Sequence, residues 1–478
     1  MKKLLLTALS ATLLLSASSC VDSLDDYNID TKNPTKVPAS TLFSNAERNL
    51  GRTMASSSVN LNVFRLYVQY WAQTTYFDES IYDINTRAIN TNFWSALYRD
   101  VLRDLQEAKT LASADILTSN KTKANQLAAI EVLEVYTWMT LVDTFGDIPY
   151  SQALNIDTPQ PKYDDDAAIY ADLATRLDRA IAALDASGDS FGDADLIYHG
   201  DVASWKMFAN SLKLRMALTI ADVDDAKART MAQQAAPNVF TSNDDNAQLN
   251  FLSTSPSTNP VWEDLVQSGR KDYVGANTFI NRLTSLNDPR LPVYFKMKPM
   301  TMTYVGGVYG TNNNYNSFSA PGAALEDPTL PGVLLSYTEV EFLLAEAAAR
   351  TYSVGGTPAS HYNAAVTASI QQWGGSAAQA AAYLAQPSVA YATAAGTYKQ
   401  KIGNQKWIAL YNQPVEAWKE YRRLDAPALV KPTQARTDLP LRFTYPVNEQ
   451  NLNTANYTAA ASAMGGDLVT SKVFWDRF

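Results

Sequence analysis

Two stretches of the sequence combine aromatic rings with amide, hydroxyl and carboxylate groups. Residues 64–98 read FRLYVQYWAQTTYFDESIYDINTRAINTNFWSALY, and residues 299–332 read PMTMTYVGGVYGTNNNYNSFSAPGAALEDPTLPG. A flat ring can cover the C–H face of a sugar while Asn, Asp or Arg bonds to its hydroxyls. A peptide would instead need exposed main-chain donors and acceptors with shallow pockets. Both ligand classes stay open from these residues alone.

The second stretch is long for a connection without regular structure, which is uncommon unless the segment is functional or disordered. Its Tyr, Asn, Ser and Gly content is that of antibody binding loops. Each aromatic residue also has an ordinary structural role: Trp71, on a predicted helix, could belong to the core, and Tyr309 and Tyr315 could pack within the loop. The candidate ligand-binding residues are Trp71, Tyr76, Asp78, Tyr82, Tyr304, Tyr309, Asn313 and Tyr315.

Sequence motifs of catalysis are scarce. No HExxH, GxSxG or P-loop spacing occurs, and the only histidines, His199 and His361, are far apart in sequence. The acidic run at 164–166 lacks the alternating ligands and the glycine of an EF-hand loop, so we predict a helix start there, no metal site and no cofactor. We expect a protein that is not an enzyme. A surface glycosidase stays open as an alternative, because it needs only two carboxylates.

The N-terminus has the pattern of a lipoprotein signal. Two lysines precede an apolar run from Leu4 to Leu15, and small residues lead to Cys20. The run is shorter than the about 20 apolar residues of a membrane span, which is typical of a secretory signal. Cys20 is the only cysteine, and acylation would remove a thiol that is a liability on an exported protein. We predict a signal peptide over 1–19 and a lipidated Cys20 followed by a polar tether over 20–40.

The composition is that of a globular protein. No stretch after the signal approaches the length of a membrane span, so we expect the N-terminal lipid alone to attach the protein to the membrane. Hydrophobic residues make up 46% of the chain and charged residues 18%. The formal net charge is −9 at pH 7, so phosphate backbones would repel the protein, and we predict no binding to nucleic acid.

Most of the chain has the apolar spacing of amphipathic helices. Ile169, Leu173 and Leu177, for example, recur at every fourth position. Ser336 and Glu339 have the spacing of a capping box at the start of another helix. The predicted helices cover residues 124–145, 164–185, 203–220, 336–350 and 404–424.

Several helix pairs of this length predict a tetratricopeptide-like stack with irregular repeats, because no 34-residue period is visible. Pro414 should begin a new turn or a kink within the last predicted helix. The strand signal is sparse, and we predict short strands near 291–305 and 441–447.

Distinctive landmarks follow one another along the whole chain. The most specific are DTFGDIPYSQAL at 143–154 and YNQPVEAWKEYRRLD at 411–425. The other landmarks are NPTKVPASTLFSNA at 33–46, PKYDDDAAIYADL at 161–173, HGDVASWKMFANSLKLRMAL at 199–218, NDPRLPVYF at 287–295, LSYTEVEFLLAEAAAR at 335–350 and RFTYPVNEQNLN at 442–453. Taken in sequence order after the lipidation cysteine, these landmarks resemble the SusD/RagB family of nutrient-binding outer-membrane lipoproteins, in its branch with the GDIPYSQA form.

The resemblance implies a mainly α fold, with irregular tetratricopeptide-type helix pairs beside a loop-rich, ligand-facing region that has little β structure. It implies a single helical domain over 41–478, with the loop-rich insertion around 251–332. It also implies a non-enzymatic protein on the outer membrane, facing the cell exterior, that delivers an oligosaccharide to a SusC-type TonB-dependent transporter. A peptide-binding member of the family and a structural adhesin remain alternatives.

Some landmark residues have a structural explanation that needs no ligand. Gly146 and Pro149 should end one helix and begin a turn. Arg422 and Arg423, in the EYRRLD run, should pair with nearby carboxylates or helix ends.

Overall fold

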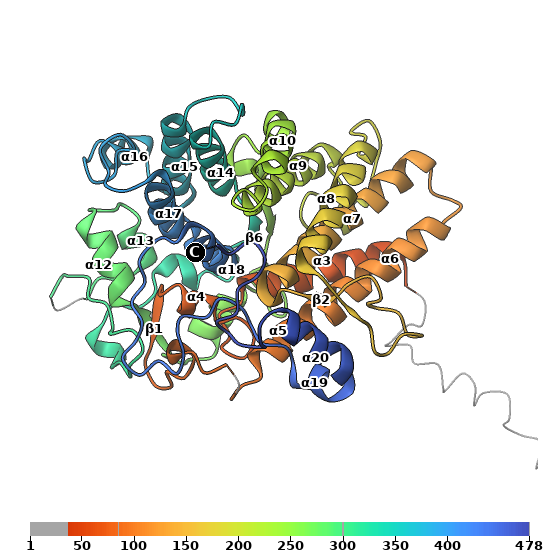
Figure 1. Ribbon diagram of the computed structural model, residues 1–478. Helices are drawn as coiled ribbons and strands as arrows, with labels where there is room; N and C mark the ends of the chain where they lie inside the picture. Colours follow the sequence, from red (N-terminus) through yellow and green to blue (C-terminus); the bar gives the residue numbers. More distant parts are fainter. Residues whose placement is uncertain (1–36, 85, 299–300, 478) are drawn as a thin grey trace, which may run out of the picture. The chain divides into compact units, whose positions relative to one another are not determined.

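The structure, a computed structural model, describes residues 37–477 apart from residue 85 and residues 299–300. Residues Ala39–Phe478 form one compact unit (Figure 1). The predicted signal peptide and Cys20 lie outside the described residues. Among the residues described, no helix combines the length and the apolar character that crossing a membrane requires.

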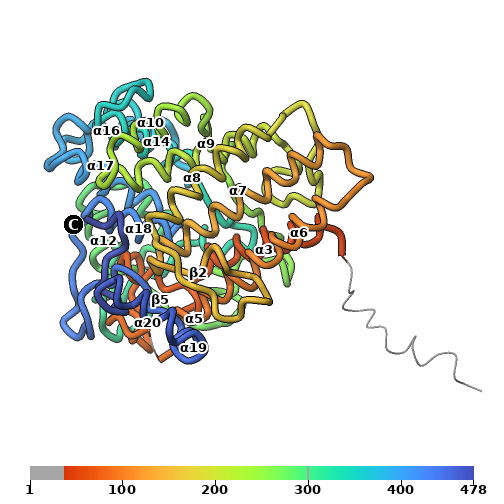
Figure 2. Tube along the Cα trace, turned by 45° about the vertical axis from the view of Figure 1, so that its right-hand side comes forward, coloured from red at the N-terminus to blue at the C-terminus, as the bar shows by residue number. Residues whose placement is uncertain are grey.

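Long helices, packed one against the next, form most of the unit. Figures 1 and 2 show a row that runs from α6 and α7 through α8, α9 and α10 to α14 and α15. This arrangement confirms the predicted mainly α fold. The row and its neighbours comprise α3 (Ala39–Ala55), α6 (Arg103–Ala114), α7 (Asn120–Phe145), α8 (Asp166–Ala183), α9 (Val202–Thr219), α10 (Asp225–Ala235), α14 (Tyr337–Ala349), α15 (Pro358–Gln372), α16 (Ala377–Leu384), α17 (Tyr398–Ala409) and α18 (Pro414–Leu424).

Side-chain caps fix where these helices begin. Asp165 accepts a hydrogen bond from the backbone N–H of Ala168, and Ser336 accepts one from Glu339. The acidic run at 164–166 therefore starts a helix, as predicted. At the C-terminal end of α7, Gly146 has a φ of +80° and donates its N–H to the Val142 carbonyl. Glycine adopts this conformation at little steric cost, so the helix ends there.

The last long helix, α18, carries a network of buried charges. Pro414 begins α18 after a short turn over Leu410–Asn412, which confirms the expected break. Arg422 donates to the Asp143 carbonyl at the end of α7. Arg423 pairs with Glu346 and Glu420 at 2.6 Å each. Both arginines thus bind helix ends or carboxylates, as the sequence predicted, and the network joins α18 to its neighbours.

The remaining elements are short. In the part of the chain that the structure describes, there are three antiparallel two-stranded pairs: β1 (Trp71–Gln73) with β5 (Tyr273–Gly275), β2 (Ile148–Pro149) with β3 (Tyr163–Asp164), and β4 (Ala247–Leu249) with β6 (Gly332–Leu335). The short helices are α4 (Phe64–Tyr67), α5 (Ile89–Leu97), α11 (Pro260–Trp262), α12 (Asn277–Ser285), α13 (Leu291–Tyr294), α19 (Val447–Leu452) and α20 (Thr454–Ala463).

The predicted strand near 441–447 was wrong, and near 291–305 the described residues form only isolated β-bridges, between Phe295 and Pro321 and between Lys298 and Thr303. Residues 291–294 form α13, whose first turn contains Pro292, a residue favoured at helix starts. Phe443 and Tyr445 alternate as they would in a strand, and both are fully buried. The Phe443 N–H, however, donates to the Thr144 carbonyl at the end of α7 instead of to a partner strand. Burial on a helix end and burial in a sheet give the same alternation of apolar residues.

Candidate functional site

A cleft of about 430 Å³ lies where β1 ends and β5 begins. The last residue of β1, Gln73, pairs with the first residue of β5, Tyr273. The pairing of β1 with β5 therefore brings two distant parts of the chain together. The loop after α3 also lies at this place and contributes to the lining. The cleft, called the Tyr76 cleft below, is lined by Ser58, Val59, Asn60, Gln73, Tyr76, Arg87, Asp264, Ser268, Arg270, Asp272 and Tyr273.

Tyr76 presents the exposed ring of this cleft, with 57% of its surface accessible. The guanidinium carbon of Arg87 lies 5.9 Å from the ring centroid. Arg87 Nε donates to Glu79 Oε1 at 2.5 Å, and the Glu79 side chain is fully buried. Because this buried carboxylate fixes Arg87, a flat apolar face and a positioned set of N–H donors stand side by side.

Gln73 holds the buried side of this arrangement together. Its Nε2 donates to Glu79 Oε2 at 2.6 Å, and its Oε1 accepts from the Ser80 hydroxyl at 2.7 Å. The amide thus uses its hydrogen-bonding groups to fix Glu79 and, through it, Arg87. Gln73 is a positioning residue for the Tyr76 ring and its arginine.

A second arginine–carboxylate pair lines the cleft. Arg270 donates through Nε and Nη2 to the two carboxylate oxygens of Asp272, at 2.5 and 3.2 Å. Asp264 accepts from the Ser57 hydroxyl at 2.7 Å, and burial raises the pKa of its carboxyl. Two arginines and two aspartates line the cleft, so its charges balance. This balance suits a neutral ligand with many hydroxyls better than a strongly charged one.

The second aromatic–polar stretch packs directly against the first. Asn313 Nδ2 donates to the Gln73 carbonyl at 3.0 Å, and Asn312 Nδ2 donates to the Thr75 carbonyl at 3.2 Å. Lys271, which follows Arg270 in the sequence, has its Nζ 5.3 Å from the Tyr315 ring centroid. The two candidate stretches therefore contact each other, and the buried Asn313 side chain provides one of the hydrogen bonds between them.

Most of the candidate residues do not line the Tyr76 cleft. Trp71 lies in β1, not on a helix, and is 1% exposed because it packs on Tyr273 and is covered by Arg65. Tyr82, Tyr309 and Asn313 are also buried. Asp78, Tyr304 and Tyr315 are half-buried outside the lining. Of the eight candidates, Tyr76 alone lines the cleft.

Sequence reasoning missed the charged residues of the cleft. Arg87 belongs to the first quoted stretch, and Arg270 and Asp272 belong to the run GRKDY at 269–273. Such a charged run directly before a strand was a usable signal, because residues at strand ends are well placed to form sites. The pairing of β1 with β5 was not visible in the sequence.

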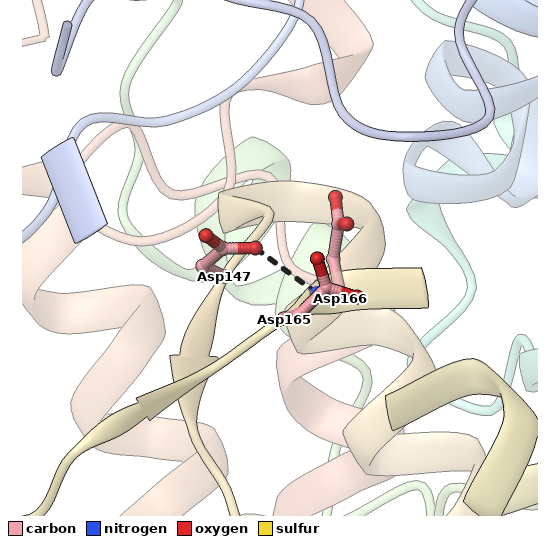
Figure 3. Close-up of side chains that lie close together, drawn as sticks. All are labelled: Asp147, Asp165 and Asp166. Carbon is pink, nitrogen blue, oxygen red and sulfur yellow. Dashed lines mark hydrogen bonds between the residues drawn. The ribbon is translucent and has the colours of Figure 1, made fainter. Parts of the chain in front are cut away.

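One acidic cluster among the described residues has the spacing of metal ligands. Asp147, Asp165 and Asp166 each offer a carboxylate oxygen within 4.8 Å of the others, at the start of α8 (Figure 3). Each of these carboxylates accepts a hydrogen bond from a backbone N–H. Asp147 accepts from Asp166 at 3.0 Å, and Asp165 accepts from Ala168 and so caps α8. Asp166 accepts from Phe474 at 2.9 Å. Burial raises the pKa of Asp166 to about 7. The cluster is explained by these structural roles.

A comparison with family models matches residues 31–446 to a SusD-like family described as starch-binding and associating with the outer membrane. A comparison with curated proteins finds no match.

Solved structures resemble the chain over nearly all of its length. A chitin-binding protein is 29% identical with a TM-score of 0.80, and the match covers 92% of this chain and 100% of that one. A chitin-binding SusD homologue from Flavobacterium johnsoniae is 26% identical with a TM-score of 0.79, covering 92% and 98%. A SusD homologue from Bacteroides uniformis is 27% identical with a TM-score of 0.78, covering 91% and 99%.

Proposed function

The chain belongs to the SusD-like family of proteins that associate with the outer membrane, and from this premise we propose that it captures an oligosaccharide in the Tyr76 cleft. In this proposal the protein is anchored by a lipid on Cys20 and faces the cell exterior. It passes the intact ligand to a SusC-type TonB-dependent transporter. The protein binds and delivers its ligand without changing it chemically.

The observation that carries this proposal is the Tyr76 ring beside the fixed guanidinium of Arg87. A sugar ring stacked on Tyr76 would bury its C–H face, while its hydroxyls would accept from Arg87 and donate to the nearby carboxylates. The balanced charges of the cleft lining favour a neutral glycan. Two of the structural neighbours are described as chitin-binding, and the family model is described as starch-binding. Chito-oligosaccharides and malto-oligosaccharides are therefore the first ligands to test in a panel of glycans.

Calorimetry on the Cys20→Ser form tests the cleft. Once a glycan of the panel binds, Tyr76→Ala should weaken its affinity by about tenfold or more, because the stacking surface is lost. Tyr391→Ala is the matched control, since the Tyr391 ring centroid also lies near a cation, 5.3 Å from Lys401 Nζ, but Tyr391 does not line the cleft. Equal affinities of Tyr76→Ala and the parent protein would refute the cleft assignment.

The same panel separates the alternatives. Short peptides serve as competing ligands, and tight peptide binding without glycan binding would favour the peptide-binding alternative. Mass spectrometry of the glycans after incubation should find them unchanged, and shortened products would instead indicate a glycosidase.

Purification of the lipidated protein from native outer membrane tests the partner. A large TonB-dependent barrel should copurify with it. Recovery of the protein without any such barrel would contradict the delivery step. It would not affect the conclusion on glycan binding, which calorimetry tests separately.

A further inference from the structure

A second cavity, of about 390 Å³, lies between α8, α9 and α10. Its size is within the range of small-molecule pockets. Ala167, Ala171 and Ala174 follow one another along a single face of α8 and line it. Because these side chains are small, the neighbouring helices leave a groove over them. This cavity, called the α8–α10 groove below, is distinct from the Tyr76 cleft and shares no lining residue with it.

The floor of the α8–α10 groove is apolar. Met216, Ile220 and Met231 are 1%, 7% and 6% exposed, and each lines the groove. Tyr170 contributes only its ring, because its hydroxyl donates to Asp143 in the core. The Phe474 ring stands at 64° to the Tyr170 ring with 5.0 Å between centroids, and forms part of the wall. Two methionines in such a floor can adapt to flexible chains.

Two cations line this apolar groove. Lys227 is half-buried and Arg477 is exposed, and within the described part of the chain neither side chain has a hydrogen-bond or ion-pair partner. Lys213, on the adjacent α9, pairs instead with Asp178 at 2.6 Å. The one carboxylate in the lining, Asp224, accepts from the Lys227 backbone N–H at 3.0 Å and so caps α10.

We propose that the α8–α10 groove binds an amphiphile with a single carboxylate and an unbranched alkyl chain, such as a medium-chain fatty acid. The alkyl chain would lie on the floor formed by the methionines and Ile220, which removes its apolar surface from water. The carboxylate would accept charge-assisted hydrogen bonds from Lys227 and Arg477. The groove recognises its ligand by one anionic head and an apolar body. The Tyr76 cleft, by contrast, has a mostly polar lining.

Calorimetry with sodium decanoate, on the full chain carrying Cys20→Ser, tests the site. We expect saturable binding that Ala171→Trp abolishes by filling the groove. Lys227→Ala together with Arg477→Ala should weaken binding roughly tenfold. Ala168→Trp and Arg179→Ala are the matched controls, because both residues are exposed on α8 outside the groove lining, and both variants should bind as the parent does.

1-Decanol separates recognition of the head from burial of the tail. The alcohol offers the same chain without the anionic head, and it should bind clearly more weakly than decanoate. The proposal is overturned if decanoate shows no saturable binding, if decanol binds as tightly, or if Ala171→Trp still binds decanoate. Circular dichroism of Ala171→Trp identifies a misfolded variant, and in that case Met231→Trp fills the groove from α10.

Discussion

Tyr309 illustrates how a tyrosine in a loop-rich region can serve the fold. Its ring is 6% exposed, whereas Tyr76 is 57% exposed. Tyr309→Ala should therefore lower the free energy of unfolding by about 3 kcal/mol, because it leaves a cavity. Tyr76→Ala should change that free energy by less than about 0.5 kcal/mol. Urea denaturation of both variants measures the difference, and similar losses would contradict the assigned roles.

His361 makes the stability depend on pH. Its Nδ1 lies 2.7 Å from Glu341 Oε2, and its Nε2 lies 3.0 Å from the Gly355 carbonyl oxygen. Both neighbours accept hydrogen bonds, so only the protonated ring can donate to both. The hydrogen bond to Glu341 raises the pKa of His361 above its ordinary value.

A raised pKa means that the folded protein holds this proton more tightly than the unfolded chain does. The stabilisation is complete below the unfolded pKa and is lost as the pH rises through the folded pKa. His361→Gln should therefore cost about 0.5–1 kcal/mol at pH 5.5 and clearly less at pH 8.5. Denaturant melts at both pH values test this, and an equal loss at both would count against it.

Asp166 acts on stability with the same sign through a different cause. Burial raises the pKa of its carboxyl to about 7, and the carboxylates of Asp147 and Asp165 add to the shift. The folded state thus binds a proton that the unfolded chain releases near pH 4, so this group's contribution to stability falls as the pH rises from about 4 to about 7.

Asp166→Asn should remove this dependence, because the amide oxygen can still accept from the Phe474 N–H while carrying no charge. Relative to the parent, the variant should gain stability at pH 8 and gain little or none at pH 4. Thermal melts at both values provide the measurement, with Asp189→Asn, a change at an exposed aspartate, as a control. A gain of the same size at pH 4 would point to a cause other than titration.

At the scale of elements, α18 depends on its buried charge network. The Arg423 guanidinium is 1% exposed and contacts Glu346, which is fully buried, and Glu420. Arg423→Met would remove the cation that joins these two buried carboxylates, and it would leave Glu346 with Arg350 and Glu420 with Lys406 as their remaining partners. We expect a loss of about 3–5 kcal/mol in the free energy of unfolding.

A surface pair provides the comparison. Lys431 and Asp438 lie 2.6 Å apart with exposed side chains, so Lys431→Met should cost less than about 1 kcal/mol. Urea denaturation of the two methionine variants should separate them clearly. Comparable losses would mean that the buried network contributes no more than a surface ion pair.

The helices could be predicted from the sequence because their signals are local. Capping residues such as Ser336 and Asp165, and stop signals such as Gly146, act within a few positions of the helix ends they fix. The short strands could not be predicted in this way. Residues 71–73 pair with 273–275, and neither segment alone shows a partner so distant in the chain.

The candidate site escaped prediction for the same reason at the scale of the whole molecule. The Tyr76 cleft joins a loop after α3, the segment after β1 and the segment before β5. The composition of residues 64–98 indicated Tyr76, because an aromatic ring among polar residues is a signal that can be seen within one short segment. Arg270 and Asp272 became part of the site only through the β1–β5 pair, a contact set by tertiary packing.

The last prediction concerns how the compact unit is held at the membrane. Ala39–Phe478 contains its own hydrophobic core, and the predicted lipid attachment at Cys20 lies outside it. Cys20→Ser should therefore move the protein from the membrane fraction to the soluble fraction while leaving its circular dichroism and melting temperature unchanged. Mass spectrometry of the parent's N-terminal peptide should find an acylated cysteine. An unmodified thiol, or a Cys20→Ser variant that stays with the membrane, would show that another part of the chain provides the attachment.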